Sequence, residues 1–252
     1  MQHVFVARGE LTVLHDVCLR VGAQEHVAIL GPNGCGKSTL LQTITCQRYP
    51  VRREDSRLRI FGRGRWDTVE LRKRLGVVSA GFPGEQTPRT SGREAVLSGF
   101  FSSSTLWPHQ HVTPEMVDRA EETLRRLEAL HLRDKPLGQM SSGESRRIMI
   151  GRALVHGPQV LLLDEPSNGL DLAAQAELRR TLRRLAGEGV GILLITHHLA
   201  DILPEMDRVV LMGSGRIIAD GPKRDMLTRE RLSALFQTEV ELTESDGFCH
   251  AW

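Results

Sequence analysis

The chain has 252 residues, 40% of them hydrophobic and 25% charged, which is an ordinary composition for a globular protein with a substantial core. Its 33 lysines and arginines nearly balance 31 aspartates and glutamates, so charge gives no reason to expect a nucleic-acid partner or direct adhesion to a membrane surface. The apolar runs are far too short to span a bilayer, and a role at a membrane would therefore depend on a partner protein.

The cysteines are scattered along the chain. They have no C-x-x-C spacing and no histidine cluster beside them, a pattern that indicates neither a zinc site nor a disulfide framework. A reducing compartment fits this cysteine usage best. The residues concerned are Cys18, Cys35, Cys46 and Cys249.

The first part of the chain favours strands. A glycine-rich turn and then a helix over residues 38–47 follow them, and residues 75–78 form a short buried strand. Residues 51–61 are strand-like but heavily charged, which predicts an edge strand. The opening strands are expected at residues 4–6, 12–14, 17–21 and 27–30.

The middle of the chain is largely helical. Apolar residues recur on one helical face between residues 113 and 132, and a second helix is expected over 141–155. Together these segments predict a helical insert spanning roughly residues 85–155. The apolar face comprises Met116, Val117, Ala120, Leu124, Leu127 and Leu130.

Strands and helices alternate again after this insert. The run at residues 160–163 is continuously apolar, as expected for a parallel strand buried on both faces. We therefore predict an α/β fold with a helical lobe. The remaining expected elements are helices over 172–186 and 199–203 and strands over 191–195, 208–212 and 216–219.

One stretch between a predicted strand and a predicted helix fits the phosphate-loop pattern G-x-x-x-x-G-K-S/T. Its glycines allow backbone N–H groups to surround phosphate oxygens, Lys37 reaches the terminal phosphates, and Ser38 offers a hydroxyl to magnesium. The alternative is a glycine turn that arose by chance, which the strand and helix on either side disfavour. The stretch consists of Gly31, Pro32, Asn33, Gly34, Cys35, Gly36, Lys37, Ser38 and Thr39.

Two adjacent carboxylates, Asp164 and Glu165, end the buried strand at 160–163. In an open α/β sheet this end of a strand is where ligands bind, so Asp164 is placed to hold magnesium and Glu165 to polarise an attacking water. The alternative is an ordinary charged exit from a strand, and the phosphate loop upstream favours the functional interpretation.

The stretch from Ser141 to Glu144 begins a predicted helix. Ser141 as N-cap and Glu144 at the third helical position form a capping box. A helix N-terminus with a serine and a glycine, here Gly143, is also an anion site. The structural and functional interpretations are compatible.

Taken in order, these motifs resemble the ATP-binding cassette family, and the resemblance covers nearly the whole chain. It rests on the phosphate loop, MSSGE, LLLDEP, Asn168 to Asp171 and Ile195 to His197. The resemblance implies that MSSGE is the signature motif, that Asp171 is the D-loop aspartate and that His197 is the switch histidine.

The family fold implied by this resemblance is a P-loop NTPase core with an antiparallel β subdomain and a helical subdomain. Residues 1–252 would then form one ATPase domain. Its nucleotide-binding core would comprise 1–84 and 156–222, its helical subdomain 85–155, and its C-terminal extension 223–252.

The resemblance also implies a mechanism. Two such domains would meet head to tail, with ATP between the phosphate loop of one and Ser141 and Gly143 of the other. Glu165 would orient water for attack on the γ-phosphate, His197 would contact that phosphate, and Mg²⁺ would offset developing charge. Because the chain carries one set of motifs, it needs a second subunit, and we expect a homodimer.

Two departures from the family pattern concern nucleotide contacts. Relatives commonly stack adenine on an aromatic side chain where this chain has Arg8, and Phe5 or His3 are alternatives to a stacked guanidinium. The signature reads Met-Ser-Ser-Gly-Glu rather than Leu-Ser-Gly-Gly-Gln, but its serine and second glycine remain, so ATP contact is expected to survive.

A third departure follows the strand at 75–78. Relatives usually place a glutamine there that touches magnesium and the attacking water, and this chain has Ala80, with Gln86 further along. Gln86 would substitute only if the intervening loop is tight.

Cys35 lies in the phosphate loop beside a helix N-terminus and near Lys37, two features that favour a reactive thiolate. Alkylation is then expected to block ATP binding. The alternative, a small buried residue without reactivity, is equally open.

The function implied is the ATP-binding subunit of an ABC transporter, which hydrolyses ATP to ADP and phosphate to power a transmembrane permease. Residues 220–236 resemble the ending of importer ATPases for iron chelates, cobalamin or molybdate. The protein would be cytoplasmic and peripheral at the inner face of the cell membrane. The alternative is a soluble non-transport relative acting in repair, assembly or regulation, which the missing glutamine at position 80 keeps open.

Four aromatic residues near the loop after residue 79 are conspicuous in a chain with 4% aromatics. They either dock a permease or pack the helical lobe's own core. The aromatic residues are Phe82, Phe100, Phe101 and Trp107.

A third possible function is a nucleotide-binding switch that does not hydrolyse ATP. It is disfavoured because Lys37, Asp164, Glu165 and His197 are all present.

Overall fold

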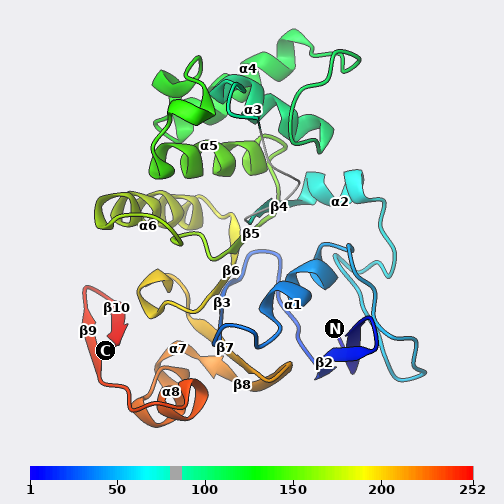
Figure 1. The fold of residues 1–252 in the computed structure, drawn as a ribbon, viewed down its shortest axis with the longest axis vertical. Coiled ribbons are helices and arrows are strands. Elements are labelled where there is room, and N and C mark those ends of the chain that lie inside the picture. The colour runs from blue at the N-terminus through cyan, green and yellow to red at the C-terminus, as the bar shows by residue number, and fades with distance from the viewer. Residues whose placement is uncertain (80–86, 252) are drawn as a thin grey trace. The chain divides into compact units, whose positions relative to one another are not determined.

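The structure, a computed structural model, describes residues 1–79 and 87–251 (Figure 1). Its contacts divide the chain into two compact units, one of Met1–Thr68 with Gly191–Trp252 and one of Val69–Val190. The predicted subdomain boundaries stay a prediction. Ala80, Gln86 and Phe82 lie outside the described residues.

A parallel sheet forms the centre of the first unit (Figure 1). The strand β3 lies between β6 and β7 and runs parallel to both, while β8 pairs antiparallel with β7. The strands β3 and β6 are almost entirely buried because they are covered on both faces. Their bounds are β3 (His26–Leu30), β6 (Gly191–Thr196), β7 (Arg208–Gly213) and β8 (Arg216–Pro222).

The chain begins with an antiparallel hairpin of β1 (Val4–Arg8) and β2 (Leu11–Val17). Alternate residues of β1 are buried, which matches the period of a strand covered on one face. The strand predicted at residues 17–21 is wrong, since β2 ends at Val17.

The strand predicted at residues 51–61 is also wrong. That stretch forms only isolated bridges, Gln2 with Arg57 and Ile60 with Arg63. Residues 51–55 are exposed and include four consecutive charged side chains, so no alternating apolar face exists to bury.

Short helices complete the first unit. The helix α1 (Lys37–Ile44) directly follows the phosphate loop, and α8 (Arg229–Phe236) begins where the Thr228 hydroxyl accepts the N–H of Arg231. The helix expected over 199–203 is a single 3₁₀ turn. The remaining elements are η4 (Leu199–Asp201), α7 (Lys223–Met226), β9 (Leu242–Ser245) and β10 (Phe248–Ala251), the last two forming a hairpin.

The second unit combines a parallel strand pair with helices. The strand β4 (Leu75–Val78) pairs in parallel with β5 (Val160–Asp164), and both are buried as predicted. The helix predicted over 113–132 ends early, at Arg126, because Leu127 leaves helical geometry and Glu128 turns left-handed at φ 55°. The other elements are α2 (Thr68–Arg74), α3 (Gly92–Ser98), η1 (Gly99–Phe101), α4 (Pro114–Arg126), η2 (Leu130–Leu132), η3 (Leu137–Gln139), α5 (Ser142–Leu154) and α6 (Leu172–Gly187).

The helices α3, α4 and α5 pack on one another, and α5 also contacts α6 (Figure 1). A buried arginine on α5, Arg152, fixes this packing by donating to the Ser98 hydroxyl at 3.0 Å and the Ser103 carbonyl at 2.6 Å. Burial, with a smaller contribution from the positive charge of Arg72, lowers the pKa of Arg152 to about 10. The position of α5 matters because its N-terminus carries Ser141.

Among residues 1–79 and 87–251, no helix has the length and apolar character needed to cross a bilayer. Two of the conspicuous aromatic residues, Phe100 and Trp107, differ in their surroundings. Phe100 packs edge-on against His156 with ring centroids 5.1 Å apart, whereas Trp107 is 52% exposed. Phe100 therefore supports the lobe's own packing, and Trp107 lies at the surface.

Candidate functional site

The phosphate loop connects β3 to α1 and closes around its own lysine. The ammonium of Lys37 donates to the carbonyls of Gly31 at 2.7 Å and Pro32 at 3.1 Å, and the residue is 6% exposed. The helix α1 begins after Gly36 without a side-chain cap. A helix N-terminus of this kind, with its backbone N–H groups and positive dipole end, is favourable for an anion.

Two glycines of this loop are required by its geometry. A Cβ on Gly31 would lie 2.2 Å from the carbonyl oxygen of Met212, and Gly36 has φ 105°, a conformation that L side chains rarely adopt. The sequence predicted these glycines from the pattern alone, and the structure supplies the reason for each.

Cys35 is 5% exposed and free of any disulfide. Its carbonyl accepts the N–H of Gly215 at 2.9 Å, which ties the loop to the turn between β7 and β8. Burial favours the structural alternative for this cysteine, because modification requires access to the thiol. Reactivity toward alkylating reagents stays a prediction.

The end of β6 places Thr196 next to the start of the phosphate loop, since the Gly31 N–H donates to the Thr196 carbonyl at 3.3 Å. The Thr196 hydroxyl donates to the Asp201 carboxylate at 2.8 Å and accepts the N–H of His198 at 3.0 Å. Thr196 and Asp201 are both buried. They frame His197, which lies between them in sequence and is half-buried.

Sequence reasoning missed Thr196 and Asp201. The available signal was a threonine at the last position of a buried strand, where a short polar side chain often bonds to groups of the following turn. The rings of His197 and His198 have centroids 3.8 Å apart and are tilted by 42°. The loop that carries the predicted switch histidine is thus held from both sides.

In the second unit, β5 delivers the two predicted carboxylates. Asp164 is its last residue, and Glu165 follows with φ 47°, in the left-handed region that non-glycine residues seldom occupy. The Glu165 carbonyl accepts the N–H of Asn168 at 3.2 Å, which forms a turn after the strand. Uncommon backbone conformations of this kind concentrate at functional sites, which supports a functional hypothesis for Glu165.

The predicted capping box at the start of α5 is present. The Ser141 hydroxyl accepts the N–H of Glu144 at 3.2 Å, and the Glu144 carboxylate accepts the N–H of Ser141 at 2.7 Å. Lys135 donates to the same carboxylate at 2.7 Å, and this contact, together with the Ser141 N–H, lowers the pKa of Glu144.

Gly143 and Asp171 meet the same alanine. A Cβ on Gly143 would lie 2.8 Å from the Cβ of Ala174, and the Asp171 carboxylate accepts the Ala174 N–H at 2.8 Å as the N-cap of α6. Gly143 therefore lets α5 approach α6 closely and Asp171 caps α6, in addition to the roles that their motifs predict.

The candidates for adenine stacking have different surroundings. Arg8 is the exposed last residue of β1. The ring of Phe5 already lies under the guanidinium of Arg53, 4.3 Å from its carbon, and His3 contacts Asp16. Stacking on a base would therefore compete with an existing contact at Phe5 and at His3.

The predicted site residues fall into two groups, one in each unit. The first unit brings the phosphate loop and the His197 turn together through Thr196. The second unit holds Asp164, Glu165 and the α5 N-terminus with Asp171. The chemistry available is a phosphate cradle in one unit and carboxylates with a further anion-binding helix end in the other.

Known proteins are similar to this chain over most of its length. The sequence profile described as ABC transporter matches residues 14–168. The hemin import ATP-binding protein HmuV of Bradyrhizobium diazoefficiens is 34% identical over 254 residues, covering 98% of this chain and 91% of HmuV.

Two solved structures are similar over most of their length. The structure of cbiO1 from Clostridium perfringens, part of the ABC transporter complex cbiONQ, has a TM-score of 0.76 at 26% identity and covers 92% of this chain and 91% of that one. A dimeric ATP-binding cassette in a post-hydrolysis state, bound to ADP and Pi, has a TM-score of 0.70 at 25% identity and covers 88% and 97%. These matches favour the first of the two predicted functions. The chain therefore belongs to the ABC transporter family, as an ATP-binding subunit that hydrolyses ATP.

Proposed function

We propose that this subunit hydrolyses ATP at sites shared between two copies of the chain. The observation that carries the proposal is Lys37, whose ammonium is held on the carbonyls of Gly31 and Pro32 at the uncapped start of α1. Nucleotide phosphates would exchange with these carbonyls as partners of the ammonium, and the N–H groups of the loop would bind the remaining oxygens.

Glu165 is the residue that orients and deprotonates water in this proposal, and His197 contacts the γ-phosphate. Support for Glu165 comes from its place directly after a buried strand and from its left-handed backbone. Support for His197 comes from the buried Thr196 and Asp201 side chains that fix its turn. A general base in the role proposed for Glu165 raises a reaction rate by about 10²- to 10⁴-fold.

Magnesium fits the donor set that the family pattern indicates. The Ser38 hydroxyl is exposed in the first turn of α1, and the Asp164 carboxylate is half-buried at the end of β5. Both are hard oxygen ligands of the type that Mg²⁺ prefers. When bound, the ion would neutralise charge on the phosphate oxygens.

The second copy would supply Ser141 and Gly143. The chain carries the phosphate loop once and the signature helix once, in different units. The similar cassette that was solved as a dimer with ADP and Pi supports a two-copy site. We infer a head-to-tail homodimer on this basis.

A mixing experiment tests whether the site is shared. Lys37→Ala and Ser141→Ala subunits are each expected to lack activity, but a mixed dimer would contain one site with an intact phosphate loop facing an intact signature helix. Phosphate release should therefore reappear when the two variants are mixed. Continued inactivity of the mixture, with dimers present by sedimentation, would contradict the shared site.

A second experiment tests Glu165 directly. Glu165→Gln should slow phosphate release by about 10²-fold or more while ATP binding is retained. Glu188→Gln is the matched control, because Glu188 belongs to the same unit and pairs with Arg126 at the far end of α6. Equal rates for Glu165→Gln and the unaltered protein would remove Glu165 from this role.

A second part of the proposal concerns the membrane partner of this subunit. We infer a transmembrane permease that imports a metal-containing solute, with this subunit at the cytoplasmic face of the membrane. Support comes from the 34% identity to a hemin import protein and from the structural similarity to cbiO1. Exposed Trp107 offers an apolar contact for a docking helix.

The partner is tested by purifying the tagged protein from its native membrane in mild detergent. A multi-span protein should co-purify, and Trp107→Ala should reduce its yield while leaving the ATPase rate of the isolated subunit unchanged. Co-purification with soluble proteins alone would contradict a permease.

A further inference from the structure

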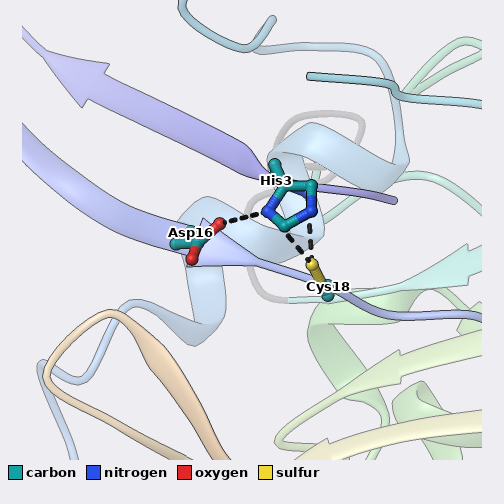
Figure 2. Close-up of side chains that lie close together, drawn as sticks. All are labelled: His3, Asp16 and Cys18. Carbon is teal, nitrogen blue, oxygen red and sulfur yellow. Dashed lines mark hydrogen bonds and ion pairs between the residues drawn. The ribbon is translucent and has the colours of Figure 1, made fainter. Parts of the chain in front are cut away.

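Three side chains capable of binding a metal meet at the open end of the β1–β2 hairpin. None of them belongs to the phosphate, signature or carboxylate motifs, and His3 is only an alternative to Arg8 for adenine stacking. Figure 2 shows His3, Asp16 and Cys18 pointing toward one another. The His3 Nδ1 lies 2.8 Å from the Asp16 Oδ1 and 3.9 Å from the Cys18 Sγ. One ligand atom from each residue lies within 4.8 Å of the other two.

The register of the hairpin explains why these residues meet. Val4 pairs with Val17, so one step outward along the two strands places His3 opposite Cys18. Asp16 and Cys18 flank buried Val17, the last residue of β2, and both are exposed. The register shift between Val4 and Val6 leaves an extra residue in β2, as in a β-bulge.

The backbone supports this arrangement. Both His3 and Asp16 have positive φ, at 48° and 55°, a conformation that is uncommon outside glycine. The backbone N–H of His3 also donates to the Cys18 sulfur at 3.2 Å. Both the backbone N–H and the ring of His3 therefore contact the Cys18 sulfur.

The distances suit a metal ion after small movements. Ligand bonds of zinc are about 2.0 Å to nitrogen, 2.1 Å to oxygen and 2.3 Å to sulfur, so ligand atoms around a tetrahedral ion are about 3.4 to 3.6 Å apart. The 2.8 Å His3–Asp16 contact would open and the 3.9 Å His3–Cys18 contact would close, each by less than about 1 Å. All three residues are exposed, which leaves room for these side-chain movements.

The competing interpretation is a simple ion pair between His3 and Asp16 at the surface. It accounts for their 2.8 Å contact. It does not account for the thiol, whose sulfur approaches the same ring nitrogen and accepts the N–H of His3. The metal interpretation explains all three side chains.

We propose that His3, Asp16 and Cys18 form a binding site for a divalent cation of borderline softness, of which Zn²⁺ is the representative. Imidazole nitrogen and thiolate sulfur select zinc-type metals over Mg²⁺ and Ca²⁺, which prefer oxygen ligands. Water occupies the remaining position, since the cluster faces solvent. The bound ion would add a tie between the start of β1 and the end of β2, beside the strand pairing and the hydrogen bonds that join Met1 to Leu19.

Cobalt is a suitable probe, because Co²⁺ binds zinc-type ligand sets and a cobalt–thiolate bond gives a charge-transfer absorption band. The full chain is titrated with Co²⁺ in nucleotide-free buffer. The expected result is a thiolate charge-transfer band that saturates at one equivalent, is abolished by an equivalent of Zn²⁺ and is unaffected by excess Mg²⁺.

Cys18→Ser should abolish the band, and Asp16→Asn should weaken Co²⁺ affinity by about tenfold or more. Cys249→Ser is the matched control, a free and half-exposed cysteine outside the cluster, and its band should equal that of the unaltered protein. Circular dichroism checks that each variant is folded. Absence of the band in the unaltered protein, or its persistence in Cys18→Ser, would overturn the proposal.

Discussion

The hydroxyl of Thr196 donates a 2.8 Å hydrogen bond to the carboxylate of Asp201, and both residues are buried. The same hydroxyl accepts the N–H of His198, so a single oxygen fixes both ends of the turn that contains His197. The Thr196 carbonyl meanwhile accepts the N–H of Gly31 at the start of the phosphate loop. Thr196 therefore connects the two parts of the first unit that are expected to contact the γ-phosphate.

Replacing Thr196 by valine should destabilise the protein and slow ATP hydrolysis. The change keeps the shape of the side chain but removes the hydroxyl from buried Asp201 and from the His198 N–H, at a cost of about 1–3 kcal/mol in the free energy of unfolding. Urea denaturation measures the loss of stability, and phosphate release measures the effect on the His197 turn.

Thr196→Ser is the control for this prediction, because it retains the hydroxyl and should keep most of the activity. A valine variant as stable and as active as the unaltered protein would show that this hydroxyl does not organise the turn.

Removing the Lys37 ammonium should weaken ATP binding by about 10- to 100-fold, since hydrogen bonds to charged groups contribute about 1.5–3 kcal/mol. Titration of Lys37→Ala with a fluorescent ATP analogue provides the measurement. Lys223→Ala is a matched control, because the Lys223 ammonium also donates to backbone carbonyls, those of Leu203 and Pro204. Equal weakening in both variants would mean that the effect comes from lost loop support rather than lost phosphate contact.

Two capping boxes separate the structural from the functional role of the signature serine. Ser141 caps α5 with Glu144, and Ser91 caps α3 with Glu94 in the same unit. Replacing either serine by alanine should cost about 1 kcal/mol of stability. Only Ser141→Ala should also lower the rate of phosphate release, because Ser91 belongs to no nucleotide motif.

Thermal denaturation and phosphate release are measured for both serine variants. Parallel losses of activity in Ser91→Ala and Ser141→Ala would indicate that Ser141 acts only as a helix cap.

The lowered pKa of Glu144 should make the free energy of unfolding depend on pH. Lys135 and the Ser141 N–H lower its pKa in the folded protein below the ordinary value of 4.5. The unfolded chain therefore takes up the proton first as the pH falls, so the contribution of Glu144 is fully present above about pH 4.5 and disappears as the pH falls through the folded pKa.

The magnitude of this effect is below about 1 kcal/mol, because the Lys135–Glu144 pair is partly exposed. Glu144→Gln keeps a capping acceptor but removes the charge, and its stability deficit in urea at pH 7 should vanish in acid. Lys135→Met should show the same convergence with pH. A deficit that persists unchanged into acid would contradict the assigned cause.

The predicted elements that failed depend on features other than their own apolar pattern. The stretch at 51–61 has β-compatible residues but no apolar face, and pairing is decided by a neighbouring strand rather than by the stretch itself. The helix expected to reach residue 132 ends at Arg126, where the next residues turn into a short 3₁₀ segment. Helix ends depend on local capping and packing that an apolar period does not encode.

The sequence alone determined the α/β class, the phosphate loop, the carboxylates at the end of β5 and the capping box at Ser141. Each depends on residues close together in the chain, whose spacing largely sets their relative positions. Tertiary structure decided what distant residues do together. Thr196 meets Gly31 only because β3 and β6 run parallel, and His3 meets Cys18 only because the β1–β2 register places them opposite each other. Strand pairing sets such contacts, and one residue of slip would separate them.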